Sequence, residues 1–154
     1  MLYGASNLAS LAVMKSIKGV ATPEDWSSLQ QRMRTTTMTA SNAAVAWYLV
    51  RYSNGDARID ARNVIPVIDI VGQRAGFRPE EYAGFGYYAA KKGLDADAYR
   101  FFAKAIETSP PRSTLPAALV QDLRAEGHAE WAGRLESFAR SRGQSPVNAE
   151  ATSR

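Results

Sequence analysis

The second half of the chain contains four helix-length segments in a row, and each one ends at a glycine or near a pair of prolines. Within each segment the apolar residues recur every three or four positions, which is typical of an amphipathic helix. The segments are residues 78–92, 95–108, 115–126 and 128–140, and the breaks are Gly93, Pro110-Pro111, Gly127 and Gly143. Because the connections are short, neighbouring helices must run antiparallel, and the pattern predicts two consecutive helical hairpins.

The first half begins with a segment of helical composition, residues 5–18, which ends at Gly19. A strong helix start follows at Thr22-Pro23, because the threonine can accept backbone hydrogen bonds and proline suits the first turn. The two acidic residues that come next favour the positive end of a helix. Three large apolar residues then share one helical face, namely Trp26, Leu29 and Met33.

The threonine-rich run at residues 35–39 interrupts this pattern, because β-branched side chains lose rotamer freedom in a helix. A new helix is predicted over residues 43–52, with Ser41 or Asn42 as its N-cap. It ends at Asn54-Gly55, a pair that is common at helix C-termini.

Residues 64–71 are ambiguous, since their density of valine and isoleucine is typical of a buried strand. Their length and the following Gly72 also fit a helix with Pro66 in its first turn and Asn63 as its cap. No other segment offers a partner strand, and a lone strand cannot satisfy its backbone hydrogen bonds. Helix is therefore favoured, and the whole chain is predicted to be all-α, with antiparallel hairpins stacked as a short α-solenoid or bundle.

The chain has 154 residues, of which 45% are hydrophobic and 22% charged, as in a soluble globular protein. We expect an N-terminal helix that could dock on a partner (1–21), a helical-hairpin domain (22–143) and a disordered polar tail (144–154). No apolar run is long enough to span a membrane. The first charges, Lys15 and Lys18, follow the apolar segment instead of preceding it as in a secretory signal, so a cytoplasmic location is predicted.

The absence of cysteine and the single histidine restrict the chemistry of the chain. They leave no disulfide, no thiol nucleophile and no Cys/His zinc site. His128 lies between two glutamates, but Gly127 interrupts the helix that metal ligation at i and i+4 would need. Asp95 and Asp97 fit a helix start better than a calcium loop, because no ligand follows at loop spacing. The sequence therefore predicts no enzyme, no metal and no cofactor.

The net charge of +4 arises in residues 1–78, which contain nine basic and five acidic residues, whereas residues 79–154 contain ten of each. Fourteen of the nineteen basic residues are arginine, whose planar guanidinium favours bidentate contacts. The arginines that lie among aromatic residues are Arg51, Arg58, Arg62 and Arg100. This balance suits an acidic protein partner or a nucleic-acid backbone. Tyr48 and Tyr52, four residues apart, have the spacing of core positions.

Residues 79–112 carry a regular pattern of small, aromatic and turn-forming residues. Its members are Tyr82, Phe85, Gly86, Gly93, Ala98, Phe102, Ala105 and Pro110. The pattern resembles one tetratricopeptide repeat, a 34-residue helical hairpin, and departs from it at Ala89, where a large residue is usual. Small residues at 86 and 98 let the paired helices approach closely, and the aromatic residues fill the space between them.

The neighbouring windows resemble the same repeat less closely. In residues 113–144 the matching residues are Leu119, Leu123, Gly127, Ala132 and Ala139, and the departures are Pro116, Val120 and Glu136. This window is similar to a degenerate terminal repeat, whose outer face acquires polar residues. Residues 44–76 match weakly, through Trp47, Gly55 and Ala61, and their spacing needs a shift.

The resemblance implies a protein that binds other proteins, as an adaptor, chaperone or assembly subunit. In this family the first helix of each hairpin lines a concave groove, and the corresponding residues here are Glu80, Tyr87, Lys91, Gln121 and Arg124. The first three are separated by seven and four positions, so they share a helical face, which we expect to point away from the paired helix. The implied partner is a protein or peptide, with acidic character as one option. The alternative is an arginine-rich helical protein that associates with nucleic acid.

Overall fold

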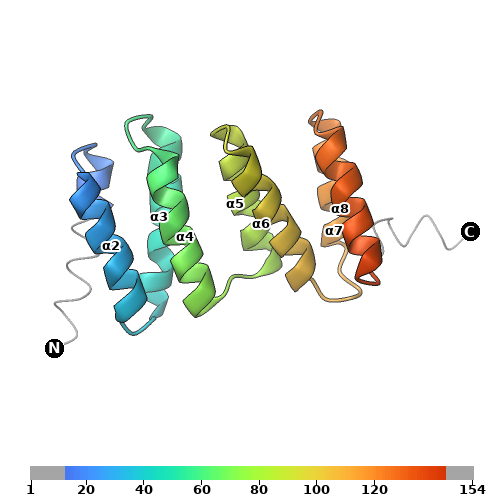
Figure 1. The fold of residues 1–154 in the computed structure, drawn as a ribbon, viewed down its shortest axis with the longest axis horizontal. Helices are drawn as coiled ribbons and strands as arrows, with labels where there is room; N and C mark the ends of the chain where they lie inside the picture. The colour runs from blue at the N-terminus through green and yellow to red at the C-terminus, as the bar shows by residue number, and fades with distance from the viewer. Residues whose placement is uncertain (1–12, 145–154) are drawn as a thin grey trace, which may run out of the picture. The chain divides into compact units, whose positions relative to one another are not determined.

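A computed structural model describes residues 13–144, and within this range every regular element is a helix. Residues 13–17 are helical, and the elements that follow are α2 (Pro23–Thr35), α3 (Ala40–Gly55), α4 (Ala61–Ala75), α5 (Pro79–Lys91), α6 (Asp95–Thr108), α7 (Leu115–Ala125) and α8 (Ala129–Ser141). The predicted all-α fold of antiparallel hairpins is confirmed (Figure 1). The chain divides after Gly76 into two compact units, which we call the N-terminal unit and the C-terminal unit.

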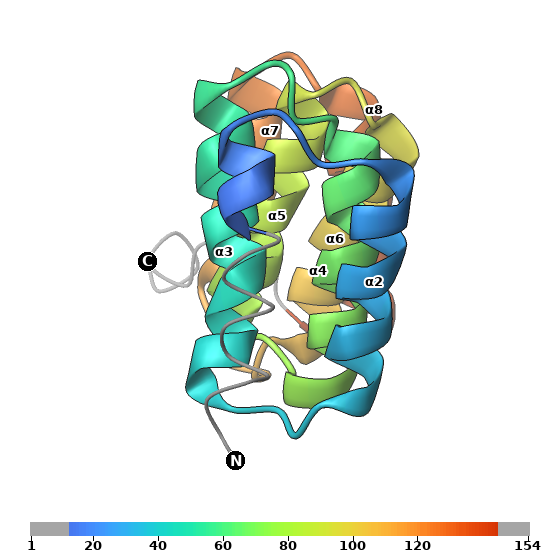
Figure 2. The same ribbon diagram turned by 90° about the vertical axis from the view of Figure 1, so that its left-hand side faces the viewer.

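The N-terminal unit has two layers of helices (Figure 2). Residues 13–17 lie beside α3 in one layer, and α2 packs against α4 in the other. The largest fully buried side chains of this unit are those of Met33, Leu49, Val64, Val67, Ile68 and Val71. They come from α2, α3 and α4, so the burial of this apolar surface holds the two layers together.

Both ends of α2 are closed by side chains. The Asp25 N–H donates to Thr22 Oγ1 at 3.2 Å, and the Thr22 N–H donates to Asp25 Oδ2 at 2.9 Å, which completes the expected N-terminal cap. At the other end, Arg74 of α4 donates to the backbone carbonyls of Met33, at 2.7 Å, and of Thr36. The last carbonyls of a helix lack intrahelical partners, so this guanidinium caps α2 and joins it to α4.

The predicted start of the next helix is wrong by a few residues. Helix α3 begins at Ala40, and its N-cap is Thr39, whose Oγ1 accepts the Asn42 N–H at 3.3 Å. Neither Ser41 nor Asn42 is the cap, because a threonine of the β-branched run supplies the capping oxygen two to three residues earlier.

Helix α4 confirms the helical alternative for residues 64–71 and begins earlier than predicted. Its N-cap is Asp60, whose Oδ1 accepts the Arg62 N–H at 2.9 Å, so Asn63 lies within the first turn. Pro66 therefore falls in the second turn, where its missing N–H removes one backbone hydrogen bond. The helix persists because its valine and isoleucine side chains are buried in the unit.

The C-terminal unit consists of the hairpins α5–α6 and α7–α8, and α6 packs against both helices of the second hairpin. Where α5 meets α6, a Cβ built on Gly86 would lie 2.5 Å from Cδ1 and Cε1 of Phe102. Carbon atoms in contact normally lie about 3.5–4 Å apart. The close approach predicted at Gly86 is therefore present, and only glycine fits there without a shift.

Gly93 ends α5 as predicted, with a φ of 75°. The Leu94 N–H donates to the Ala89 carbonyl at 2.9 Å and the Gly93 N–H to the Ala90 carbonyl at 3.1 Å, which is a Schellman motif. The left-handed conformation that this turn requires is accessible to glycine at little cost. Gly127, 34 residues later, ends α7 with the same pair of hydrogen bonds.

The second helices of three successive hairpins begin 34 residues apart, at Ala61, Asp95 and Ala129. Two sets of fully buried residues recur with the same spacing. One set is Val64, Ala98 and Ala132, and the other is Val71, Ala105 and Ala139. The starts of α4, α6 and α8 and these buried positions are thus each spaced by 34 residues. The first helices are spaced less regularly, since α3, α5 and α7 begin at Ala40, Pro79 and Leu115.

The predicted boundary after residue 21 does not coincide with a division of the structure. Val13 and Ser16 are buried, and Lys15 Nζ lies 3.1 Å from Asp25 Oδ1 of α2. Residues 13–20 thus belong to the N-terminal unit, because their side chains contribute to its packing. The single domain predicted for residues 22–143 is divided after Gly76.

Gln144, the first residue of the predicted disordered tail, is part of the packed structure. Gln144 is buried, and its Nε2 donates to the carbonyls of Ile106 at 2.7 Å and Ser109 at 3.0 Å. The Ile106 carbonyl also accepts the Ser109 N–H at 3.1 Å, so Gln144 adds a second donor at the end of α6 and joins the residues after α8 to it. The remaining parts of the two terminal predictions, residues 1–12 and 145–154, lie outside the described residues.

Candidate partner-binding surfaces

The residues predicted to bind a partner on α5 differ in their surroundings. Glu80 and Lys91 are exposed near the two ends of the helix. Tyr87 is half-buried, with its ring edge-on to Phe102 at a centroid distance of 5.1 Å and its hydroxyl donating to Asp122 Oδ2 at 3.4 Å. The expectation that Tyr87 points away from the paired helix is wrong, because Phe102 belongs to α6.

Tyr87 stays a neutral hydrogen-bond donor over a wide pH range. Burial raises the pKa of its phenol to about 12, and the carboxylates of Asp122 and Glu126 contribute to the shift. A phenolate at this position would lose hydration and be repelled by both carboxylates. The side chain therefore links α5 to α7 in addition to presenting one edge to solvent.

On α7, Gln121 is exposed as predicted, whereas Arg124 forms an ion pair with a residue of α8. Arg124 Nη2 forms an ion pair with Glu136 Oε2, and Glu136 Oε1 accepts from Arg140 Nη2 at 2.8 Å. The Arg124 guanidinium also holds the pKa of Glu136 below its usual value. The arginine predicted to contact a partner instead joins α7 to α8, where Glu136 occupies the position of the usual aromatic residue.

The charges next to Tyr87 do not favour an acidic partner. Asp122 and Glu126 act on its phenol, and Lys91 follows it by one helical turn. With Arg124 directed to α8, two carboxylates and one ammonium remain beside Tyr87. This surface suits a neutral or basic segment better than an acidic one.

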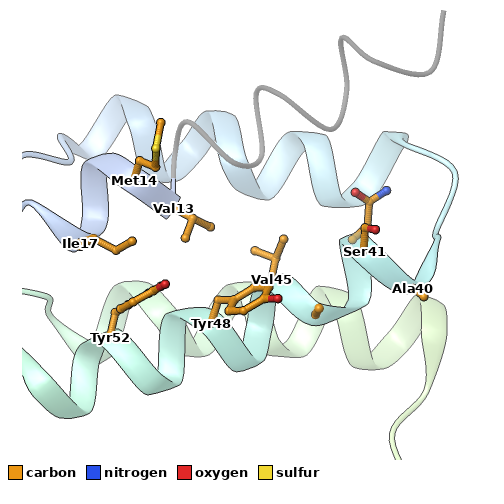
Figure 3. A pocket seen from close by; sticks show the side chains of 10 residues that line it. Val13, Met14, Ile17, Ala40, Ser41, Val45, Tyr48 and Tyr52 are labelled. Atoms are coloured by element: carbon orange, nitrogen blue, oxygen red, sulfur yellow. The ribbon is translucent and has the colours of Figure 1, made fainter.

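A groove in the N-terminal unit is a second candidate surface, which the sequence did not indicate (Figure 3). It has a volume of about 560 Å³ and lies between helical residues 13–17 and α3. The lining includes Val13, Met14 and Ile17 on one side and Ser41, Val45, Tyr48 and Tyr52 on the other. A volume of this size is within the usual range for ligand-binding pockets.

The groove forms because the lining residues of each helix share one face. Residues 41, 45, 48 and 52 are separated by four, three and four positions, and Val13 and Ile17 by four. Val45 is buried at the base, whereas Met14 and Tyr48 are 49% and 48% exposed. Large side chains that remain half exposed along one continuous groove, instead of being scattered, mark a site of interaction.

The core prediction for the two tyrosines of α3 is wrong for Tyr48 and partly right for Tyr52, which is half-buried. A spacing of four identifies a shared face, but it does not tell whether a neighbour covers that face. One feature of the sequence could have located the groove. Arg51 is the only charged residue of α3, so the helix is apolar around most of its circumference. Its apolar surface is therefore larger than one neighbouring layer of helices can bury.

No protein-family model matches the chain, and no curated protein or solved structure is significantly similar to it. None of the helices in residues 13–144 has the length and apolar character needed to cross a membrane. In the same part of the chain, no three His, Asp or Glu side chains are grouped so as to hold a metal ion. The assignment of function therefore depends on the geometry of the two surfaces.

Proposed function

We propose that this protein is a non-enzymatic helical-repeat protein that binds a partner polypeptide, as an adaptor, chaperone or assembly subunit. The observation that carries the proposal is the groove beside α3, where half-exposed Met14 and Tyr48 border one cavity of about 560 Å³. Tyrosine and methionine are enriched in protein interfaces, and anchoring residues of a partner commonly insert into such pockets.

The shape of the groove suits a polypeptide segment. Its α3 side extends from Ala40 to Tyr52, which corresponds to roughly 18 Å at the helical rise of about 1.5 Å per residue. This length accommodates about three turns of a partner helix, or five to six extended residues. The hydroxyls of Ser41 and Tyr48 offer hydrogen bonds beside the apolar base, as in the helix-in-groove mode of recognition.

The contacts of the arginines count against the alternative of nucleic-acid binding. Nine of the thirteen arginines in residues 13–144 contact carboxylates, backbone carbonyls or aromatic rings of this chain. They are Arg58, Arg62, Arg74, Arg78, Arg100, Arg124, Arg134, Arg140 and Arg142. A phosphate backbone would have to compete for these guanidinium groups, so a polypeptide partner is the better supported reading.

The test selects peptides from a displayed library of random sequences on the full chain and measures their affinity by fluorescence anisotropy. The variant Met14→Glu/Tyr48→Glu should weaken binding at least tenfold, because a partner's apolar side chains would have to bury two carboxylates. Both side chains are half exposed, so the variant should keep the helical circular dichroism of the wild type.

The matched control is Val20→Glu, since Val20 is 59% exposed and does not line the groove. This variant should bind the selected peptides like the wild type. Selected peptides that bind Met14→Glu/Tyr48→Glu with wild-type affinity would contradict the groove as the site. If the same peptides instead lose affinity for Lys91→Ala/Gln121→Ala, the partner belongs to the surface of α5 and α7.

A further inference from the structure

We infer that the groove beside α3 recognises an amphipathic helical segment that carries acidic residues next to its apolar face. This inference rests on the proposed function and specifies the chemistry of the partner. It follows from the apolar base of the groove, described above, together with the charges at its borders.

Two cationic side chains, which do not line the groove themselves, follow residues that line it by about one helical turn, and this spacing places them at its borders. Lys18 follows Met14 by one helical turn, with its N–H bonded to the Met14 carbonyl at 3.2 Å. Arg51 follows Tyr48 by three residues on α3. Both are exposed, and neither forms an ion pair with another residue of the described part of the chain.

The chain places no acidic residue on either lining segment. Residues 13–20 and α3 contain no Asp or Glu. The acidic residues nearest along the sequence are Glu24, which is exposed on α2, and two aspartates that are already paired, Asp25 with Lys15 at 3.1 Å and Asp56 with Arg58 at 2.7 Å. The positive charge at the borders of the groove is therefore left for a partner to neutralise.

An acidic helix complements these features better than the two other candidate occupants, the chain's own residues 1–12 and a nucleic acid. Residues 1–12 precede the groove directly but contain no Asp or Glu, so they would leave Lys18 and Arg51 without a partner. A nucleic acid would meet two cations that lack an ion pair beside an aliphatic base of Val13, Ile17 and Val45, whereas tight phosphate binding uses a longer row of cations. Three turns of helix match the length of the groove and place acidic residues at its borders.

The test uses three synthetic peptides of about 16 residues with leucine at the same i, i+3, i+4 and i+7 positions. Their flanking positions are all Glu, all Gln or all Lys. At low salt the Glu peptide should bind the full chain about three- to tenfold more tightly than the Gln peptide, and the Lys peptide should bind least. High salt should bring the three affinities together.

The variant Lys18→Gln/Arg51→Gln should abolish the preference for the Glu peptide and leave the affinity of the Gln peptide unchanged. Arg112→Gln is the matched control, because Arg112 is exposed and belongs to the C-terminal unit. Equal binding of all three peptides would overturn the acidic preference while the proposed function stands. If none of them binds and no library peptide binds, the proposed function itself fails.

Two further results would overturn the inference by assigning the groove to another occupant. Peptide binding that appears only after deletion of residues 2–12 would assign the groove to the chain's own N-terminal segment. Displacement of the Glu peptide by a single-stranded oligonucleotide, with a steep dependence on salt, would assign it to nucleic acid. Retained binding of the Glu peptide in both experiments supports the acidic helix.

Discussion

Replacing Gly86 by alanine tests the close packing of α5 against α6. The added Cβ would lie 2.5 Å from two ring carbons of Phe102, about 1 Å closer than carbon atoms normally approach. The ring has no room to move away, because Phe102 is fully buried between Tyr87, at 5.1 Å, and Trp131, at 6.2 Å.

The expected change in the free energy of unfolding is the sum of two opposing effects. Forcing an extra methyl group into a packed core costs about 1–3 kcal/mol, and this contact lies toward the upper end because two atoms clash. Alanine is about 1 kcal/mol more favourable than glycine inside a helix. We therefore expect Gly86→Ala to lower the free energy of unfolding by about 1–2 kcal/mol.

Gly133 of α8 provides the matched control, because a Cβ added there meets no other atom within 4 Å. Gly133→Ala should raise the free energy of unfolding by about 0.5–1 kcal/mol. The assay is urea unfolding followed by circular dichroism at 222 nm. In a Phe102→Leu background the cost of Gly86→Ala should shrink by at least ~1 kcal/mol, since the clashing ring is gone. Stabilisation by Gly86→Ala equal to that by Gly133→Ala would refute the close approach.

Three other predictions concern contacts that join elements. Arg74→Ala should lower the free energy of unfolding by about 1–3 kcal/mol, because the guanidinium caps two carbonyls at the end of α2. Arg62→Ala removes only an exposed ion pair and should have a clearly smaller effect in the same urea assay. Gln144→Ala should lower the free energy of unfolding by about 1–3 kcal/mol, because the Ser109 carbonyl loses the Gln144 donor and the Ile106 carbonyl keeps only the Ser109 N–H. An unchanged melting temperature would contradict this role. Tyr87 has a folded-state pKa of about 12, above the unfolded value of about 10, so its contribution to stability is present below pH 10 and lost as the pH rises through 12. Stability measured between pH 9 and 12 should therefore fall less steeply in Tyr87→Phe than in the wild type.

Much of the fold could be predicted from local sequence signals. The turn at Gly93, the start at Thr22 and the close approach at Gly86 each depend on one residue whose conformation or size is decisive. Helix boundaries were less predictable where several residues could supply the same cap. Thr39 and Asp60 became caps in place of later residues, because neighbouring polar side chains can satisfy the same backbone N–H groups.

The candidate site depended on tertiary contacts that the sequence does not encode locally. Periodicity alone placed Tyr87 and Arg124 on an outer face, but Phe102 and Asp122 hold Tyr87, and Glu136 on the next helix binds Arg124. The groove beside α3 was not predicted, because periodicity assigned its side chains to the core. An uncovered apolar face has the same spacing of side chains as a covered one. Local signals were enough to predict most helices, their turns and the small residue at the crossing of α5 and α6, since these follow from backbone conformation and side-chain volume within a few positions. Which apolar faces are covered and which charged groups are paired emerges from the fold alone, because both depend on side chains brought together from distant parts of the chain.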